Sequence, residues 1–131
     1  MLAADLNGDG KTDLINDGGV FLGNGDGTFK WVSQLRSDSP FTQQFADALA
    51  DIDGDGKPDV IGRRYSGSSH SEGVYPGYGD GIFGFFIDAD DFGTSRLRWV
   101  RVADMNGDGK PDLIFFVDPE AKNVCAAKYE C

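Results

Sequence analysis

The sequence is poor in basic residues, histidine and cysteine, and each shortage excludes a class of protein. Lysine and arginine number 12 against 22 acidic residues, a formal net charge of −10, so we expect no basic face for nucleic acid. The single histidine, His70, and the two cysteines leave no cluster of zinc ligands. The longest uninterrupted apolar run, residues 113–117, is far too short to span a membrane.

The two ends of the sequence add little. Residues 1–5 have neither the basic start nor the apolar stretch of a signal peptide. Cys125 and Cys131 would lie roughly 20 Å apart in an extended segment, and only a turn between them would allow a disulfide. The spacing is therefore compatible with a disulfide, with two free thiols or with a bond to another chain, and the redox compartment stays open.

What the sequence does contain is an acidic motif in three copies, the main signal of an internal repeat. Each copy has Asp or Asn at positions one, three, five and nine, Gly at four and six, and Lys at seven. The copies occupy residues 5–13, 51–59 and 104–112. A second motif, Gly-x-Gly-Asp-Gly-x-Phe, follows at residues 23–29 and 77–83. The near-constant distance from its closing Phe to the next acidic motif indicates that one structural unit repeats.

The variation in length between repeats is confined to one place. Asp59 is eight residues farther from the second motif than Asp13 is. The extra residues lie within 63–72, a stretch rich in Ser and Gly, for which we predict a surface loop.

Short apolar stretches between the motifs predict β-strands, because they are β-branched or aromatic and no stretch keeps a helical period. One strand enters each acidic loop, one leaves it, one precedes the Gly-Asp-Gly turn and one follows it. Four antiparallel strands per repeat are typical of a β-propeller blade, so we expect an all-β fold. The single domain of residues 1–131 would hold two to three blades: repeat one at about 1–43, repeat two at about 44–96 and an incomplete repeat three at about 97–131.

So few blades do not close a propeller, which needs about four to eight. Isolated blades would leave unpaired strand edges and a half-covered core. A homo-oligomer of two or three copies would complete a ring. The alternative is that the chain forms part of something larger.

The oxygen-rich chemistry of the acidic motif predicts a calcium ion in each of the three loops. Three or four carboxyl or amide groups within nine residues repel one another unless a cation is present. Calcium accepts carboxylate, amide and backbone oxygens, whereas magnesium prefers to keep several waters. The glycines allow the chain to curl around the ion, with the carbonyl of position seven as a further ligand.

An EF-hand is excluded by position twelve of the loops. An EF-hand loop carries a bidentate Glu at position twelve and is flanked by helices. The three loops of this sequence have Asn16, Gly62 and Phe115 at that position, and predicted strands follow them. A solvated acidic turn is the alternative for any one copy, but three copies with matched positions favour a metal site. For the Gly-Asp-Gly motif we predict a hairpin turn, with a second metal site as the alternative.

Together the two motifs resemble the FG-GAP/VCBS repeat, which builds the head of integrin α subunits and several lectin and polysaccharide-active propellers. The resemblance covers nearly the whole chain and implies that each acidic loop joins the first and second strands of a blade. It also implies three calcium sites, in which each Lys contributes its backbone carbonyl. The implied ligands are Asp5, Asn7, Asp9, Lys11 and Asp13; Asp51, Asp53, Asp55, Lys57 and Asp59; and Asp104, Asn106, Asp108, Lys110 and Asp112.

The resemblance implies a recognition module outside the cell or at its surface, with a carbohydrate as the favoured ligand. Integrin-like protein adhesion and a purely structural repeat are the alternatives. Aromatic rings beside polar groups suit sugar faces, and the candidate ligand residues around the insertion are Tyr65, His70, Tyr75 and Tyr78, with hairpin packing as the alternative for the tyrosines. The sequence shows no nucleophile–base pattern or phosphate-binding loop, so we expect no enzyme.

Overall fold

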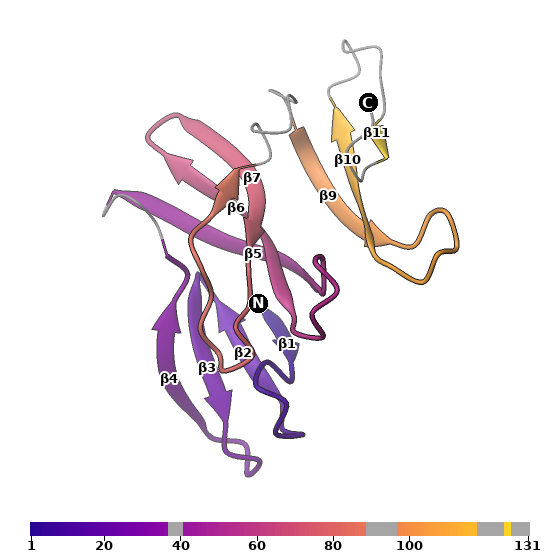
Figure 1. Ribbon diagram of the computed structural model, residues 1–131. Coiled ribbons are helices and arrows are strands. Elements are labelled where there is room, and N and C mark those ends of the chain that lie inside the picture. The colour runs from indigo at the N-terminus through magenta and orange to yellow at the C-terminus, as the bar shows by residue number, and fades with distance from the viewer. Residues whose placement is uncertain (37–40, 89–96, 118–124, 127–131) are drawn as a thin grey trace.

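The chain folds into antiparallel β-sheets. The computed structural model describes residues 1–36, 41–88, 97–117 and 125–126, and within these ranges it contains strands and no α-helix (Figure 1). In the same ranges, no helix is long and apolar enough to cross a membrane. The predicted all-β class is confirmed. Cys131, and with it the pairing of the two cysteines, lies outside the described residues.

The first two sheets each have four strands in chain order. The first sheet consists of β1 (Leu2–Ala4), β2 (Asp13–Asn16), β3 (Gly19–Gly23) and β4 (Phe29–Gln34). The second consists of β5 (Thr42–Ala50), β6 (Asp59–Ser66), β7 (Ser69–Tyr75) and β8 (Ile87–Asp88). The third sheet, in the order β11-β10-β9, consists of β9 (Leu97–Ala103), β10 (Asp112–Val117) and β11 (Cys125–Ala126).

Each acidic loop joins the first and second strands of its sheet, and each Gly-Asp-Gly motif lies beyond the third. Turn chemistry explains the tight hairpin of the first repeat. Asp17 and Gly18 connect β2 to β3 with φ angles of 47° and 76°, the left-handed pair that a two-residue hairpin of type I′ requires. Local turn residues and the alternation of apolar side chains therefore set the strand order together.

The surface loop predicted for residues 63–72 is wrong. These residues extend the β6–β7 ladder instead, pairing Arg63 with Glu72 and Tyr65 with His70 in register, and the chain turns at Gly67 and Ser68. Ser and Gly have a low intrinsic preference for strands, but strand formation depends on context, and here each residue pairs with a partner on the other strand. The second repeat thus differs from the first by a longer hairpin.

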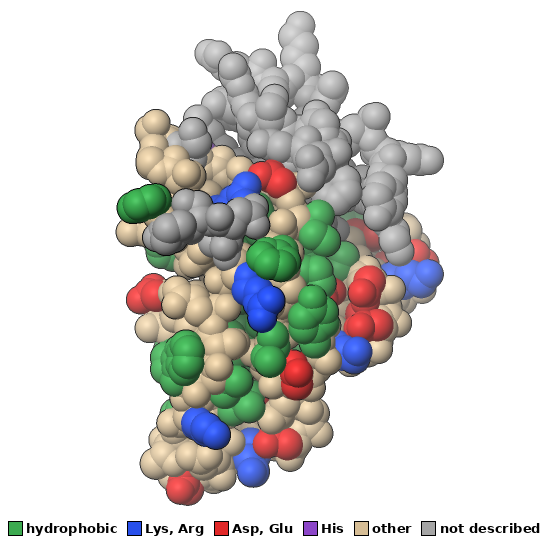
Figure 2. All heavy atoms as spheres, turned by 60° about the vertical axis from the view of Figure 1, so that its left-hand side comes forward, with side chains coloured by type: hydrophobic (Ala, Val, Ile, Leu, Met, Phe, Trp, Pro, Cys, Tyr) green, Lys and Arg blue, Asp and Glu red, His purple; other side chains and the backbone are tan. Residues whose placement is uncertain are grey.

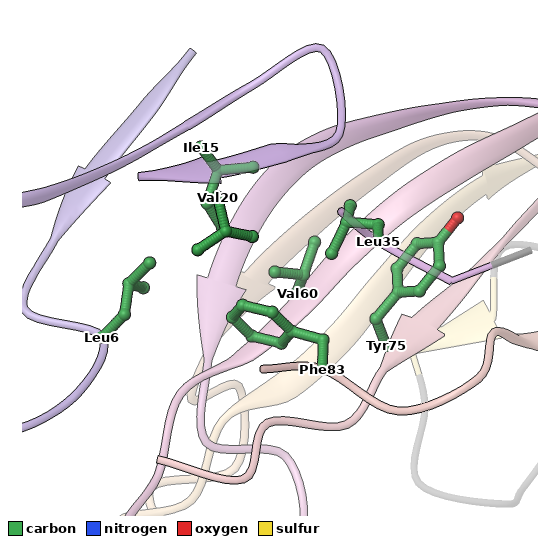
Figure 3. Packing of buried hydrophobic residues seen from close by; sticks show 7 residues of the cluster. All are labelled: Leu6, Ile15, Val20, Leu35, Val60, Tyr75 and Phe83. Atoms are coloured by element: carbon green, nitrogen blue, oxygen red, sulfur yellow. The ribbon is translucent and has the colours of Figure 1, made fainter. Parts of the chain in front are cut away.

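The hydrophobic core lies between the first and second sheets. Ile15, Val20 and Leu35 from the first repeat point toward Val60, Tyr75 and Phe83 from the second, and Leu6 joins them from the first acidic loop (Figure 3). All seven are at most 2% exposed, and full burial of such a side chain stabilises the fold by about 1.5–3 kcal/mol. This face-to-face contact fixes the two sheets against each other.

The second sheet stands between the other two (Figure 1). Successive side chains of a strand point to opposite faces, so Ile61, which is buried, faces away from the core around Val60. Strands β1 and β2 of the first sheet contact β5 of the second sheet, and β9 of the third sheet contacts β5 and β7. The three repeats therefore form a series of sheets that pack side by side.

Two buried polar atoms lack a hydrogen-bond partner within the described part of the chain. They are Oε2 of Glu72 and the hydroxyl of Tyr75. Burial raises the pKa of Glu72, because a carboxylate loses its hydration in this position. Burial also raises the pKa of Tyr75, which therefore remains neutral.

Replacing Glu72 by Gln should stabilise the fold at neutral pH and leave it unchanged in acid. A carboxyl whose pKa is higher in the folded state takes up a proton on folding, so its ionisation destabilises the fold as pH rises. We expect Glu72→Gln to increase the free energy of unfolding by about 1 kcal/mol at pH 7 and by nothing measurable near about pH 3, where the carboxyl is protonated in both states. Urea denaturation at the two pH values measures this, and equal gains at both would contradict the assignment.

Candidate functional site

The first Asp of each acidic loop organises the loop around its own carboxylate. Oδ1 of Asp5 accepts hydrogen bonds from the backbone N–H groups of Gly8 at 2.7 Å and Asp9 at 3.2 Å, and Oδ2 accepts one from Gly10 at 2.8 Å. The backbone curls around one side chain in this way only because the glycines adopt left-handed φ angles, 77° at Gly8 and 80° at Gly10.

The other two loops repeat this pattern. Asp51 accepts hydrogen bonds from Gly54 and Gly56 at 2.8 Å each, and Asp104 accepts them from the matching glycines of loop three at 2.7 and 2.8 Å. These N–H groups, above all that of the sixth loop residue, lower the pKa of Asp5, Asp51 and Asp104. The first position of every loop therefore carries a full negative charge at neutral pH.

The third and fifth positions continue the curl. Asn7 accepts a hydrogen bond from the N–H of Asp9 at 3.1 Å, and Asp9 accepts one from Lys11 at 2.9 Å. The corresponding distances in loop two are 3.0 and 2.9 Å, and those in loop three are the same. Each loop thus directs its oxygen-bearing side chains inward along one short stretch of backbone.

In loop two, three carboxylates come together. One oxygen from each of Asp51, Asp53 and Asp59 lies within 4.8 Å of the others. Asp59 is 2% exposed, and burial raises its pKa, assisted by the negative charges of Asp53 and Asp55. Such an arrangement of like charges favours a cation among them.

The ninth Asp makes two hydrogen bonds that the sequence did not reveal. Oδ2 of Asp13 accepts a hydrogen bond from the N–H of Leu6 in its own loop, and Oδ1 accepts one from Gly23 at the start of the second motif, both at 2.8 Å. Asp59 bonds Ile52 and Gly77 in the same way, at the same distances. This carboxylate therefore ties the acidic loop to the end of the third strand of the sheet.

The first residue of the second motif must be glycine because its backbone lies against the backbone carbonyl of the residue that precedes the ninth Asp. A Cβ atom on Gly23 would lie 2.0 Å from the carbonyl oxygen of Thr12, and one on Gly77 would lie 1.9 Å from that of Pro58. No real Cβ atom approaches an oxygen so closely. The sequence signal for this close approach is the recurrence of the glycine in both copies of the motif, which a turn alone also explains.

The lysine at position seven also links the two motifs. Its aliphatic stem passes over the turn, with carbon atoms of Lys11 at 3.4–3.6 Å from a Cβ position on Gly25, and those of Lys57 at 3.0–3.4 Å from one on Gly79. The ammonium groups lie near the fifth loop residue, 3.8 Å from Asp9 and 3.5 Å from Asp55 in half-exposed pairs. A long apolar stem under an exposed charge suits this position.

The Gly-Asp-Gly motifs themselves form turns. The N–H of Asn24 donates to the carbonyl of Thr28 at 2.9 Å, and that of Tyr78 to the carbonyl of Ile82 at 3.1 Å. Asp26 accepts hydrogen bonds from the N–H and hydroxyl of Thr28. The Asp side chain is therefore engaged within the turn, as the hairpin prediction requires.

The four candidate ligand residues separate in the structure. Tyr65 and His70 form a cross-strand pair on the extended hairpin, with stacked rings 5.6 Å apart. Tyr78 is 55% exposed but belongs to the turn at the opposite end of β7. Tyr75 is 0% exposed and packs against Phe86 in the core, so it does not form part of a surface site. Of the four, the structure brings together only Tyr65 and His70.

The comparison with known families matches this geometry. The FG-GAP-like repeat family matches the chain twice, over residues 5–62 and 51–115. The chain belongs to the FG-GAP-like repeat family. The two matches overlap across the second acidic loop, and each begins at the first Asp of a loop. Membership implies a β-propeller-type module, in agreement with the four-stranded sheets. No solved structure matches the chain.

Replacing Gly77 by Ala should break the link between loop and strand. The new methyl group forces the Pro58 carbonyl away and lengthens the bond to Asp59, so we expect the free energy of unfolding to fall by about 2 kcal/mol or more. Gly67→Ala is the control, because its Cβ position is open and only the φ of 61° opposes it, which costs about 1 kcal/mol. Thermal denaturation compares the two, and equal losses would contradict the assigned role of Gly77.

Proposed function

We propose that the chain is a calcium-binding recognition module of the β-propeller type, without enzymatic activity, whose second repeat binds carbohydrate. The observation that carries the calcium assignment is the convergence of Asp51, Asp53 and Asp59 within 4.8 Å. Loops one and three share its hydrogen-bond pattern, with Asn7 and Asn106 at the third position.

The donor set fits calcium. Every side chain that points into a loop offers oxygen, the donor that hard cations prefer, and a carboxylate oxygen that accepts one N–H retains a lone pair for a cation. In this proposal the ligands are the residues at positions one, three, five and nine together with the carbonyl of position seven. Bound calcium would neutralise the clustered carboxylates, and three ions would offset six charges of the formal −10.

Calcium should stabilise the fold, and loop two should bind it most tightly. Loop two carries four acids where the others carry three and an Asn, and more ligand charge raises affinity for a hard cation. Saturation at a thousandfold excess over the dissociation constant would add about 4 kcal/mol. Calorimetric titration should show three sites, and Asp53→Asn should weaken the strongest of them.

The matched control for this titration is Asp80→Asn, which removes a carboxylate from the Gly-Asp-Gly turn and should leave all three affinities unchanged. Melting curves with calcium and with chelator complete the test. An unchanged melting midpoint in chelator, or a loop two weaker than the others, would contradict the proposal.

The carbohydrate surface would be the extended β6–β7 hairpin. Tyr65 and His70 present neighbouring rings, and Phe45 packs edge-on against Tyr65 at 5.5 Å. Arg63 donates two hydrogen bonds of 2.7 Å to Asp47 and one of 3.1 Å to the Tyr65 hydroxyl. Aromatic faces pack against the C–H face of a sugar, while a fixed polar pair at their edge offers donors and acceptors to its hydroxyls.

Removal of the Tyr65 ring should weaken sugar binding. We expect a glycan array to identify a ligand, and Tyr65→Ala to weaken its binding about tenfold or more, which corresponds to the loss of one stacked ring. Tyr78→Ala is the control, since this exposed tyrosine lies at the other end of β7. Equal losses in both variants would place the ligand elsewhere.

A protein ligand is the second candidate, favoured by exposed apolar side chains at and just before β8. Phe85 is 58% and Ile87 45% exposed, and Arg36 lies over the Phe85 ring at 5.7 Å. On the face viewed in Figure 2, hydrophobic side chains gather in the middle and acidic ones lie mainly toward the margins. A location outside the cell or at its surface would serve either ligand, because extracellular modules bind calcium at about 10⁻⁴–10⁻³ M. Absence of any bound glycan on the array would favour the protein ligand.

A further inference from the structure

Three identical tetrapeptides occur in the chain, and the structure gives them two different environments. Asn-Gly-Asp-Gly forms residues 7–10 of the first acidic loop, residues 106–109 of the third loop and residues 24–27 of the first Gly-Asp-Gly motif. Loop two carries Asp53 in place of the asparagine. Because the local sequence is the same at the three sites, any difference in their chemical reactivity comes from the fold.

An asparagine followed by glycine can lose its side-chain amide without an enzyme, and asparagine is a chemically labile residue for this reason. The glycine nitrogen, once its proton has passed to a base in water, attacks the side-chain carbonyl carbon. A carbon–nitrogen bond forms, the amide nitrogen takes up a proton and leaves as ammonia, and a five-membered succinimide remains. Water then opens the ring at either carbonyl and gives aspartate or isoaspartate. Glycine favours the attack because it has no side chain and adopts φ angles that other residues avoid.

In the two acidic loops the attacking nitrogen is already engaged. The N–H of Gly8 donates to Oδ1 of Asp5 at 2.7 Å, and the N–H of Gly107 donates to Oδ1 of Asp104 at the same distance. Both distances are at the short end of the range for such bonds, and a hydrogen bond to a charged acceptor is stronger than a neutral one. The glycine nitrogen must break this bond before it can attack, so the loop protects its own asparagine.

The side chain under attack is engaged in these loops as well. Oδ1 of Asn7 accepts a hydrogen bond from the N–H of Asp9 at 3.1 Å. Oδ1 of Asn106 accepts one from the N–H of Asp108 at 3.0 Å. These bonds hold the asparagine carbonyl toward the fifth loop residue and restrict its rotation toward the glycine nitrogen. Both reacting groups are therefore constrained by the curl of the loop.

In the turn of the first repeat, by contrast, the attacking nitrogen is free. The backbone N–H of Asn24 donates to the carbonyl of Thr28 at 2.9 Å, and Nδ2 donates to the hydroxyl of Thr28 at 2.8 Å. Within the part of the chain that the structure describes, neither the N–H of Gly25 nor Oδ1 of Asn24 makes a hydrogen bond. Both residues are exposed, so the pair is open to water.

The exposure of this pair does not depend on what lies beside the first sheet. The second repeat carries Tyr78 at the position of Asn24, and there a neighbouring sheet is present. A Cβ on Gly81 of that turn would lie 3.1 Å from the side chain of Leu22, yet Tyr78 is 55% exposed. The second residue of the motif therefore faces solvent whether or not its turn packs on another sheet.

We propose that Asn24 is a modification site, at which attack by the Gly25 nitrogen converts the asparagine into aspartate or isoaspartate. The same tetrapeptide is protected in the acidic loops by the carboxylate of the first Asp. Each conversion consumes one water and releases one ammonia, and it needs no enzyme and no further reagent. The inference goes beyond the proposed function and does not rest on calcium or carbohydrate binding.

The modification would change the point at which the acidic loop is attached to the sheet. Asn24 directly follows Gly23, whose N–H bonds the buried carboxylate of Asp13. An aspartate at position 24 adds a negative charge at this point. An isoaspartate adds a methylene group to the backbone inside the turn that Thr28 closes. The reaction would therefore mark the first repeat and leave the second repeat, with Tyr78 at this position, unaltered.

The experiment is peptide mapping by mass spectrometry of the full chain after incubation in mildly alkaline buffer with calcium. Exchange of the amide for a carboxyl changes the mass of each peptide, and an isoaspartyl methyltransferase labels the isoaspartate product. We expect Asn24 to react about tenfold or more faster than Asn7 and Asn106, the effect of having no hydrogen bond to a charged acceptor to break. In a chain unfolded by urea the three sites should react at similar rates.

Two substitutions test the cause of the difference. Asn24→Tyr introduces the residue that the second repeat carries in the same turn, and it should abolish the fast reaction while the chain stays folded. Asp5→Ala removes the acceptor of the Gly8 N–H and should increase the rate at Asn7 about tenfold or more. Asn106 in the same molecule should stay slow.

The matched control is Asp51→Ala, the same substitution in the loop that has no asparagine at its third position, and it should leave the rate at Asn7 unchanged. Circular dichroism establishes that each variant is folded. If Asp5→Ala fails to fold, the comparison of Asn24 with Asn106 in the unaltered chain decides the matter.

Four results would overturn the proposal. They are equal rates at the three sites of the folded chain, a faster reaction in either acidic loop than at Asn24, and a rate at Asn7 that Asp5→Ala leaves unchanged in a folded chain. The fourth is loss of the protection in chelator while circular dichroism still reports a folded chain, because that result would assign the protection to a cation instead of the N–H bond.

Discussion

The carboxylate of the ninth loop residue is the interaction on which the structure depends. It is buried, and its two oxygens accept backbone N–H groups from opposite directions, as in the bonds of Asp13 to Leu6 and Gly23. Hydrogen bonds to a charged acceptor are stronger than neutral ones, and their loss would leave a buried charge without compensation. The distance between the acidic loop and the third strand is thereby fixed, whatever the length of the hairpin between them. This explains how the second repeat gained eight residues without losing its geometry.

The same bond couples the loop to the hydrophobic core. The residue whose N–H it holds is the second of the loop, and in the first repeat this residue, Leu6, is a core side chain. A loop that curls correctly therefore delivers an apolar group to the adjacent sheet. A cation held by the carboxylates would act on packing through this one residue, because any displacement of the ninth Asp moves the N–H bonded to it. The acidic loop and the contact between sheets are consequently parts of one unit.

The sequence was sufficient for the features that depend on local chemistry. Acidic positions, glycines with left-handed φ and the turn motif specify the loops and hairpins residue by residue, and the four-stranded order follows from them. The sequence was insufficient where the structure of a segment depends on partners far along the chain. The ladder of Arg63 and Tyr65 with Glu72 and His70 was hidden because Ser and Gly around the turn resemble a loop. Tyr75 was misplaced because one position in a strand separates a core residue from a surface residue. The hydrogen bond from the Gly77 N–H to Asp59 spans 18 residues, and neither motif by itself indicates it.

The comparison of repeats also shows which positions serve packing and where the second repeat adds residues of its own. Positions shared by the repeats form the acidic loops and the apolar pairs that pack one sheet on the next, and changes there would disturb the contact between sheets. The extended hairpin of the second repeat lies beyond the shared ladder, since Gly62 pairs with Gly73 at its limit and Arg63 begins the extension. Ser66, Ser68 and His70 near the tip of this extension are exposed, whereas Glu72 at its base is buried. The two glycines mark that boundary physically, because a Cβ on Gly62 would lie 2.1 Å from the Phe45 carbonyl and one on Gly73 2.0 Å from that of Ile87. A hairpin anchored by so tight a base is free to vary in the residues at its tip, and those residues are where a specific ligand is most easily accommodated.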